Sequence, residues 1–158
     1  MSADRLAGSM TCVAYVTVMT LGTLAAQADL PATRMVSVDG RMMQVRTAGL
    51  DSRKAGTPIL VLEAGAGATL DAWDQVFADL ARLAPVVAYD RRSHGRSEAD
   101  TVPQTIKRDI ENLRALLQSL SLGPPYVLVG HSGHQVQRND PALVAHLVSH
   151  VLKYARLK

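Results

Sequence analysis

The chain has 158 residues, of which 47% are hydrophobic and 20% are charged, and its formal net charge is +3. These proportions are typical of a globular domain and differ from those of disordered or fibrous chains. The positive charge is scattered over separate arginines and forms no Lys/Arg block, which argues against a nucleic-acid partner. The length predicts one domain.

Residues 1–28 have the pattern of a secretory signal. Arg5 precedes an apolar stretch, and Ala26-Gln27-Ala28 supplies small residues at a cleavage site. We therefore expect cleavage before Asp29 and export to the periplasm or the extracellular space. The mature domain would be residues 29–158.

A membrane anchor is the alternative interpretation of the same stretch. Residues 10–26 are shorter than the ~20 strongly apolar residues of a spanning helix and are interrupted by threonines. The sequence therefore predicts no stable membrane anchor. Cys12, the only cysteine, lies in this leader, so the mature chain would contain no disulfide.

The first elements after the leader are predicted to be strands. Residues 35–38 and 42–47 flank Asp39-Gly40, a dipeptide that favours the positive φ angles of a tight hairpin turn. The apolar run 58–62 has the composition of a buried strand, and the glycine-rich segment 63–67 follows it as a loop.

Helices and strands alternate in the rest of the chain. The first is a helix N-capped by Asp71 and ended by Pro85, with one apolar face: Trp73, Phe77, Leu80 and Ala84. A strand at 86–89 precedes a second helix, which ends at Gly123 and Pro124 and has the apolar face Ile106, Ile110, Leu113, Leu117 and Leu120. After a strand at 126–129, a helix from Pro141 is expected to pack against the sheet through Leu143, Val144, Leu147, Val148, Val151 and Leu152. This alternation predicts an α/β fold, a three-layer α/β/α sandwich with a mostly parallel sheet.

A candidate nucleophile follows the last predicted strand. Gly130-x-Ser132 directly after a buried strand is the first part of a nucleophile elbow, a sharp turn that exposes a serine oxygen at the carboxyl edge of a sheet. Such a serine needs a histidine base, a carboxylate that orients the histidine, and N–H donors for the oxyanion.

Three segments together resemble the first half of an α/β-hydrolase. They are Leu62-Glu63-Ala64-Gly65-Ala66-Gly67, Tyr89-Asp90-Arg91-Arg92 and Val129-Gly130-His131-Ser132. The order of elements from residue 35 to 132 also matches this family. The resemblance implies that the N–H groups of Ala66 and Gly133 form the oxyanion hole.

Other interpretations of the glycine-rich loop are a plain strand-to-helix turn or a nucleotide-binding loop. A dinucleotide fingerprint would place a third glycine at position 70, where this chain has Leu70. The elbow two strands later favours the oxyanion loop.

The chain departs from the family pattern after Ser132. Members usually have Gly-x-Ser-x-Gly, but His134 stands at the last glycine position. Residues 132–137, followed by Asp140-Pro141 and a helix, resemble instead the far C-terminal end of the family, where a Gly-His pair presents the catalytic base. We therefore expect a truncated α/β-hydrolase domain without its central cap and acid-bearing region, through a genuine deletion or an error in the gene model.

No catalytic acid is identified. Asp140 resembles the residue that precedes a helix in this family, whereas Asp90 is expected to hold its loop and Glu63 lies beside the oxyanion loop. Asp90 and Glu63 remain alternatives for the acid. His134 lies only two residues from Ser132, a spacing at which helical side chains do not face each other.

Three other histidines are expected to be non-catalytic. His94 is interpreted as a solvated loop residue, and its neighbour Ser93 stands where relatives tend to have glycine. His146 and His150 have the i, i+4 spacing of a metal pair, but no third ligand accompanies them and they lie on a polar helix face. We expect neither a metal nor a cofactor.

The resemblance implies a serine hydrolase of the esterase type. Ser132 would attack a small-molecule ester, thioester or amide, and His134 would move the proton. A serine at the elbow argues against the epoxide and haloalkane branches, whose members use an aspartate there. The competing hypothesis is a non-catalytic remnant or interaction protein.

The missing region also predicts self-association. In complete members the strand before the elbow lies inside the sheet, whereas here the strand at 126–129 would form an apolar edge. Unpaired backbone groups on such an edge template pairing with another chain. We expect a homo-oligomer through this strand.

Overall fold

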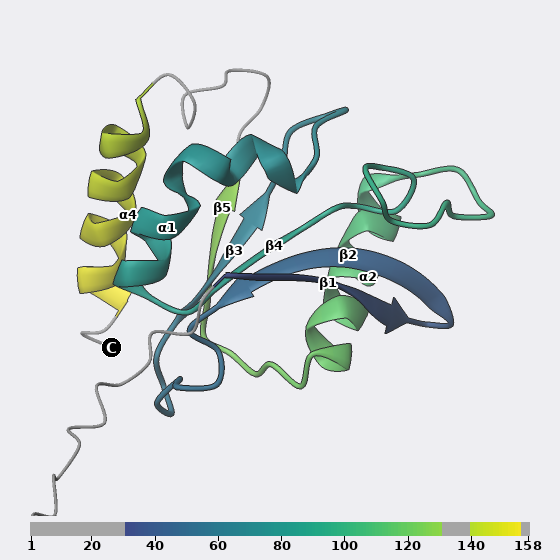
Figure 1. The fold of residues 1–158 in the computed structure, drawn as a ribbon. Helices are drawn as coiled ribbons and strands as arrows, with labels where there is room; N and C mark the ends of the chain where they lie inside the picture. The colour runs from purple at the N-terminus through teal and green to yellow at the C-terminus, as the bar shows by residue number, and fades with distance from the viewer. Residues whose placement is uncertain (1–30, 131–139, 156–158) are drawn as a thin grey trace, which may run out of the picture.

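A five-stranded sheet with helices on both faces forms the body of the protein (Figure 1). A computed structural model describes residues 31–130 and 140–155. The strands are β1 (Ala32–Val38), β2 (Arg41–Ala48), β3 (Ile59–Glu63), β4 (Val86–Tyr89) and β5 (Tyr126–Gly130), in the spatial order β1-β2-β4-β3-β5. β3 pairs in parallel with β4 and β5, whereas β2 is antiparallel to β1 and β4. The predicted three-layer α/β fold is confirmed.

The opening hairpin forms at the predicted turn. β1 and β2 pair from Ala32↔Thr47 to Val38↔Arg41. Asp39 and Gly40 have φ angles of 48° and 75°, as the mirror-image turns of tight hairpins require. The local sequence therefore determines this register.

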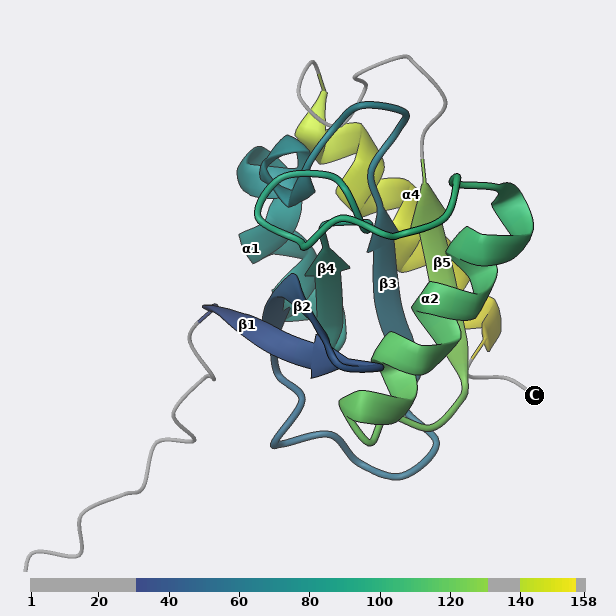
Figure 2. The same ribbon diagram turned by 90° about the vertical axis from the view of Figure 1, so that its right-hand side faces the viewer.

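Side chains alternate between two apolar clusters, one on each face of the sheet. Leu60 and Leu62 of β3 belong to the cluster beneath the helices η1, α1 and α4, while Ile59 and Val61 belong to the cluster beneath α2. Figure 2 shows α2 in front of the sheet and the other helices behind it. β3 is consequently buried on both faces, as is usual for a parallel strand.

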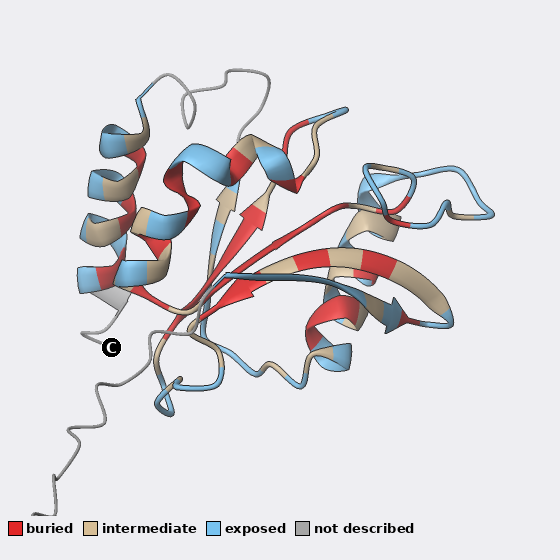
Figure 3. Cartoon of the chain, in the orientation of Figure 1, coloured by how far each residue is buried: buried red, intermediate tan, exposed pale blue. Residues whose placement is uncertain are grey.

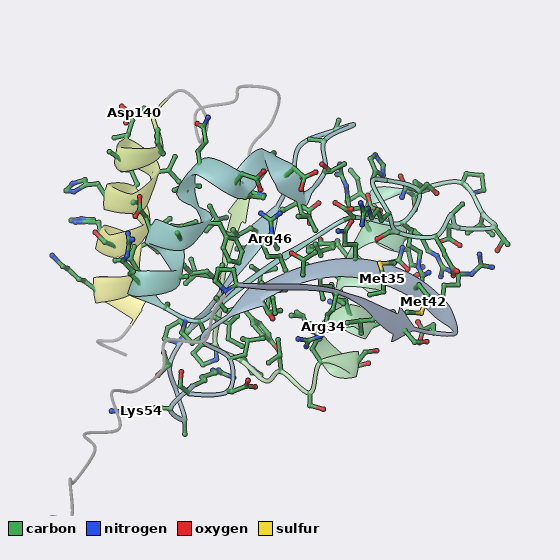
Figure 4. The ribbon with its side chains drawn as sticks, in the orientation of Figure 1. Arg34, Met35, Met42, Arg46, Lys54 and Asp140 are labelled. Atoms are coloured by element: carbon green, nitrogen blue, oxygen red, sulfur yellow. The ribbon has the colours of Figure 1, made fainter. Side chains whose placement is uncertain are left out.

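The helix after β3 begins differently from the prediction. It consists of a 3₁₀ turn, η1 (Leu70–Trp73), which runs into α1 (Asp74–Leu83). Asp71 is not the N-cap, since it lies inside η1 and its carboxylate accepts a 3.2 Å hydrogen bond from Arg46. Arg46 points from β2 toward these helices, where it also pairs with Asp74 (Figure 4). A cross-element ion pair thus replaces the expected cap.

The helix α2 (Ile106–Ser119) is capped at both ends by local hydrogen bonds. The Thr105 hydroxyl accepts a 3.2 Å bond from the Arg108 N–H. At the other end Leu122 N–H donates to the Leu117 carbonyl and Ser121 N–H to Gln118, the pattern of a Schellman motif. Gly123, the predicted terminator, lies beyond this motif.

The buried face of α2 is also narrower than predicted. Leu116 and Leu117 are buried, but Ile106 and Ile110 are 82% and 47% exposed. The apolar periodicity correctly indicated a helix, but only its second half covers described parts of the sheet.

The last helix, α4 (Pro141–Ala155), lies beside α1 on the face opposite α2 (Figures 1 and 2). Its buried side chains are Val144, Val148 and Leu152. The expectation that all six apolar residues pack against the sheet is wrong for the other three, because Leu143, Leu147 and Val151 are exposed. Within residues 31–130 and 140–155, no helix is long and apolar enough to cross a bilayer.

β5 differs from the other parallel strands because it lies at the sheet edge. Figure 3 shows β3 and β4 as buried, whereas exposed and half-buried residues alternate along β5. Leu128 is 63% exposed.

The predicted signal sequence, residues 1–28, lies outside the described residues.

Candidate functional site

The carboxyl ends of β3 and β5 lie side by side and define the candidate site. Glu63, the last residue of β3, is in register with Gly130, the last residue of β5. A Cβ atom at Gly130 would lie 3.6 Å from the Cβ atom of Glu63. The last residue of β5 therefore lies next to the start of the loop that follows Glu63. Ser132, Gly133 and His134 lie outside the described residues, and their roles stay predictions.

The loop after β3 presents the N–H group of Ala66 at this edge. Ala66 is exposed, and no residue of the described ranges 31–130 and 140–155 binds its N–H group. The loop turns back because the Gly65 carbonyl accepts a 3.1 Å bond from the Ala68 N–H and Gly67 takes a φ of 71°. Beside the loop lies a shallow hollow, which is lined by residues 66–69, 71, 72 and 74. An available N–H beside a hollow is compatible with the predicted oxyanion role of Ala66.

Arg91 anchors this loop. Its Nη2 donates a 2.6 Å hydrogen bond to the Gly65 carbonyl, and its Nη1 lies 3.4 Å from a Glu63 oxygen. The other Glu63 oxygen accepts a hydrogen bond from the Tyr89 hydroxyl. Glu63, Tyr89 and Arg91 therefore form a partly buried cluster that connects the ends of β3 and β4 to the loop.

Burial sets the titration of this cluster. Desolvation raises the pKa of the Glu63 carboxyl above its usual value, while the Tyr89 hydrogen bond and the Arg91 charge oppose that rise. The pKa of Tyr89 is also raised, first by burial and then by the Glu63 charge. Because both Glu63 oxygens have partners within the cluster, the carboxylate acts as a structural anchor here.

Asp90 holds the neighbouring loop. It is 1% exposed, and its two oxygens accept backbone bonds from Leu70 at 2.7 Å and from Arg96 at 3.1 Å. A Cβ atom at Gly95 would lie 1.9 Å from Asp90 Oδ2, so a side chain at 95 would displace the carboxylate. The interpretation of Asp90 as a loop-fixing residue agrees with these contacts.

The histidines outside the elbow make no catalytic cluster. His94 is partly buried, and its Nδ1 lies 3.0 Å from the Arg92 carbonyl. Ser93 has a φ of 64°, a conformation that favours the glycine expected at this position. His146 and His150 are exposed on α4, and the described residues contain no group of three metal-binding side chains.

Asp140 is a helix cap. Its Oδ1 accepts a 2.9 Å bond from the Leu143 N–H, directly before α4 begins at Pro141. The predicted position of Asp140 ahead of a helix is therefore confirmed. Asp140, the one described carboxylate after β5, thus uses one of its oxygens to cap α4.

Sequence reasoning missed Arg91 as a functional residue. The sequence held a signal, because a charged residue two positions after a buried strand needs a partner if it is itself partly buried. However, only the pairing of β3 beside β4 brings Arg91 to the Gly65 carbonyl.

Known proteins share this arrangement of strands and loops. The sequence profile of the alpha/beta hydrolase family matches residues 59–152. An AB hydrolase superfamily protein of Gibberella zeae is 33% identical over 76 residues, which are 48% of this chain and 24% of that protein.

Solved structures are similar over the same part. An epoxide hydrolase of Vigna radiata, VrEH1, matches with a TM-score of 0.53 and 27% identity, over 65% of this chain and 31% of that one. A bacterial membrane phospholipase A matches with a TM-score of 0.57 and 22% identity, over 65% and 32%. The chain thus spans about a quarter of the curated relative and about a third of these structures. Because the family profile covers more than half of the chain, this protein belongs to the alpha/beta hydrolase family.

Proposed function

We propose that this chain derives from a serine hydrolase that cleaves ester-type bonds of small molecules through an acyl-enzyme. The observation that carries the proposal is the register of Gly130 with Glu63. It supports a site in which Ser132, two residues past the strand end, lies at the same edge as the N–H group of Ala66, an exposed residue.

The proposed reaction needs only groups of the chain and water. The Ser132 Oγ attacks the acyl carbonyl, and His134 takes its proton and transfers it to the leaving alcohol, thiol or amine. A water molecule then cleaves the acyl-serine bond. The Ala66 and Gly133 N–H groups would stabilise the oxyanion in both steps.

The chemistry of epoxide hydrolases is a second candidate because VrEH1 is among the similar structures. The family resemblance implies an aspartate nucleophile for that branch, whereas this chain has Ser132. The residue at the elbow therefore favours ester-type substrates.

We further propose that turnover is slow. Both oxygens of Asp90 and of Glu63 have structural partners, and Asp140 caps α4 through one oxygen, so each of the three carboxylates already has a structural role. A triad that lacks an oriented base loses most of its rate enhancement, while oxyanion donors alone retain a smaller part. Weak activity would also fit the alternative of a non-catalytic remnant.

A labelling experiment separates weak catalysis from none. The chain and Ser132→Ala are incubated with a fluorophosphonate probe and with p-nitrophenyl acetate, and the modified residue is mapped by mass spectrometry. We expect slow labelling at Ser132 and slow hydrolysis, both absent in Ser132→Ala and unchanged in Ser119→Ala, which alters an exposed serine at the end of α2. Equal labelling of wild type and Ser132→Ala would contradict the proposed nucleophile.

Export is a separate proposal. If residues 1–28 are a signal sequence, the N-terminus of the secreted protein should be Asp29. Edman sequencing or intact mass of protein recovered outside the cytoplasm would test it, and an intact Met1 there would contradict cleavage.

A further inference from the structure

The outer side of β5 carries unpaired backbone groups. Pro125 directs its carbonyl toward β3, where it accepts a 3.0 Å bond from the Ile59 N–H. Along a parallel strand, alternate residues direct both backbone groups to the same side. The N–H and C=O groups of Tyr126, Leu128 and Gly130 therefore point away from β3, and no described strand lies beyond them.

The same residues form an apolar surface on the α2 side of the sheet. Tyr126 and Leu128 are in register with Ile59 and Val61, which face α2, but they are 38% and 63% exposed. No residue of β5 is charged. We call Tyr126, Leu128 and Gly130, with their outward backbone groups, the β5 edge.

The connection after β5 is shorter than the crossover that a further parallel strand would need. Nine residues, 131–139, join Gly130 to Asp140, and Asp140 lies at the carboxyl end of the sheet, where β5 also ends (Figure 4). A crossover to a further parallel strand takes about a dozen residues or more. α4 then packs on the face away from the exposed Tyr126 and Leu128 side chains.

We propose that the β5 edge binds the β5 edge of a second copy of this chain. The two strands run antiparallel about a two-fold axis at Leu128, so Leu128 pairs with its own copy and Tyr126 pairs with Gly130 of the other molecule. This register joins all the outward N–H and C=O groups of the three residues in hydrogen-bonded pairs. The two sheets become one continuous sheet.

Two features of the edge fit a second copy. Gly130 has no side chain, so it leaves room for the Tyr126 ring of the opposite strand. The absence of charge on β5 means that the symmetric contact brings no like charges together, which would otherwise oppose pairing of identical strands. A two-fold contact of this kind is self-complementary by construction.

The test is the oligomeric state of the full chain, measured by size-exclusion chromatography with light scattering over a range of concentrations. We expect a dimer that dissociates on dilution. Leu128→Pro removes the outward N–H but none that bonds to β3, and Leu128→Lys places a charge on the two-fold axis. Each should raise the dissociation constant at least about tenfold, a loss of about 1.4 kcal/mol.

Two controls separate this edge from other apolar surfaces. Leu147→Lys alters a leucine on α4 that is 55% exposed, and Met35→Lys alters β1 at the opposite edge of the sheet. Both should leave the dimer intact. Circular dichroism checks that each variant folds, and if Leu128→Pro unfolds, Leu128→Lys decides the outcome.

Three results would overturn the proposal. They are a wild-type monomer at every concentration, a dimer that persists in both Leu128 variants, and a dimer that is lost only in Met35→Lys or Leu147→Lys. Amide hydrogen exchange gives an independent readout, because the Leu128 N–H should become protected as the protein concentration rises.

Discussion

β3 and β5 are neighbouring strands with similar sequences but opposite environments. Ile59-Leu60-Val61-Leu62 and Tyr126-Val127-Leu128-Val129 are both short apolar runs, and they pair in register with each other. The four β3 residues are at most 1% exposed, whereas Leu128 is 63% exposed. An apolar run therefore predicts a strand, but the elements packed beside that strand determine whether it is buried.

The helix layers account for the difference. α2 places Leu116 and Leu117 over the cluster that contains β3, while its first half leaves Ile106 and Ile110 exposed. Beyond β5 no described element supplies the missing contacts. The sheet is therefore well packed at β3 and β4 and open at β5.

The largest expected effect tests this contrast directly. Leu60→Ala should lower the free energy of unfolding by about 2–5 kcal/mol, because it leaves a cavity between β3 and the α1 layer. Leu128→Ala in dilute, monomeric protein should cost less than about 1 kcal/mol, since most of that side chain is already in solvent. Urea denaturation of both variants measures the difference. Equal losses would show that β5 is covered in the monomer.

A second variant tests the cluster at the carboxyl end of β3 and β4. Arg91→Met should destabilise the protein by about 1–3 kcal/mol, because it removes a charge-assisted bond to the Gly65 carbonyl and the partner of Glu63. The loss should be larger at pH 7 than at pH 4. Glu63 already has a raised pKa, and without Arg91 the pKa rises further, so stability falls as the folded carboxyl is forced to ionise.

Arg82→Met is the matched control for Arg91. The Arg82 side chain is 75% exposed and pairs only with Asp79 on the same helix, so its loss should cost less than about 0.5 kcal/mol at either pH. Denaturation curves at both pH values make the comparison. A pH-independent loss in Arg91→Met would mean that Glu63 is not its partner.

A smaller effect, of opposite sign, is expected in the connection that leads from α2 to β5. Ser121 has a φ of 54° at the end of α2, and its side chain is exposed. Ser121→Gly should stabilise the chain by about 0.4–1 kcal/mol, because glycine adopts this conformation without strain. The thermal midpoint should rise, and a decrease would contradict the Schellman geometry.

The smallest expected effect concerns the exposed half of α2. Ile110→Gln should change the free energy of unfolding of the dilute monomer by less than about 0.5 kcal/mol, as for other surface substitutions. Leu117→Gln, about two turns further along the same helix, buries a polar group in the core and should cost several times more. A large loss at Ile110 would show that the first half of α2 packs against something in the monomer.

Much of the fold could be predicted because short stretches of sequence determine it. The Asp39-Gly40 turn, the buried runs of β3 and β4 and the helical periodicity of α2 are each decided by neighbouring residues. The details that failed depend on partners distant in sequence. Asp71 was predicted to cap a helix, but Arg46 from β2 binds its carboxylate.

The candidate site could be predicted less completely. The loop with Ala66 and the strand leading to Ser132 were recognisable from their order along the chain, and the family assignment is confirmed. A catalytic acid could not be chosen among Asp90, Glu63 and Asp140 from the sequence. The residue type is the same whether a carboxylate caps a helix, anchors a loop or takes part in catalysis. Only its hydrogen-bond partners distinguish these roles.

The sequence by itself determined the elements, their alternation and the family, because backbone conformation and apolar periodicity act over a few residues. The open edge at β5 agrees with the expectation drawn from the family resemblance. In contrast, tertiary structure alone decided that Leu143, Leu147 and Val151 of α4 stay exposed and that Arg91 holds the loop of Ala66. The physical reason is that burial and ion pairing are properties of surfaces in contact. Those contacts exist only after the strands have taken the order β1-β2-β4-β3-β5.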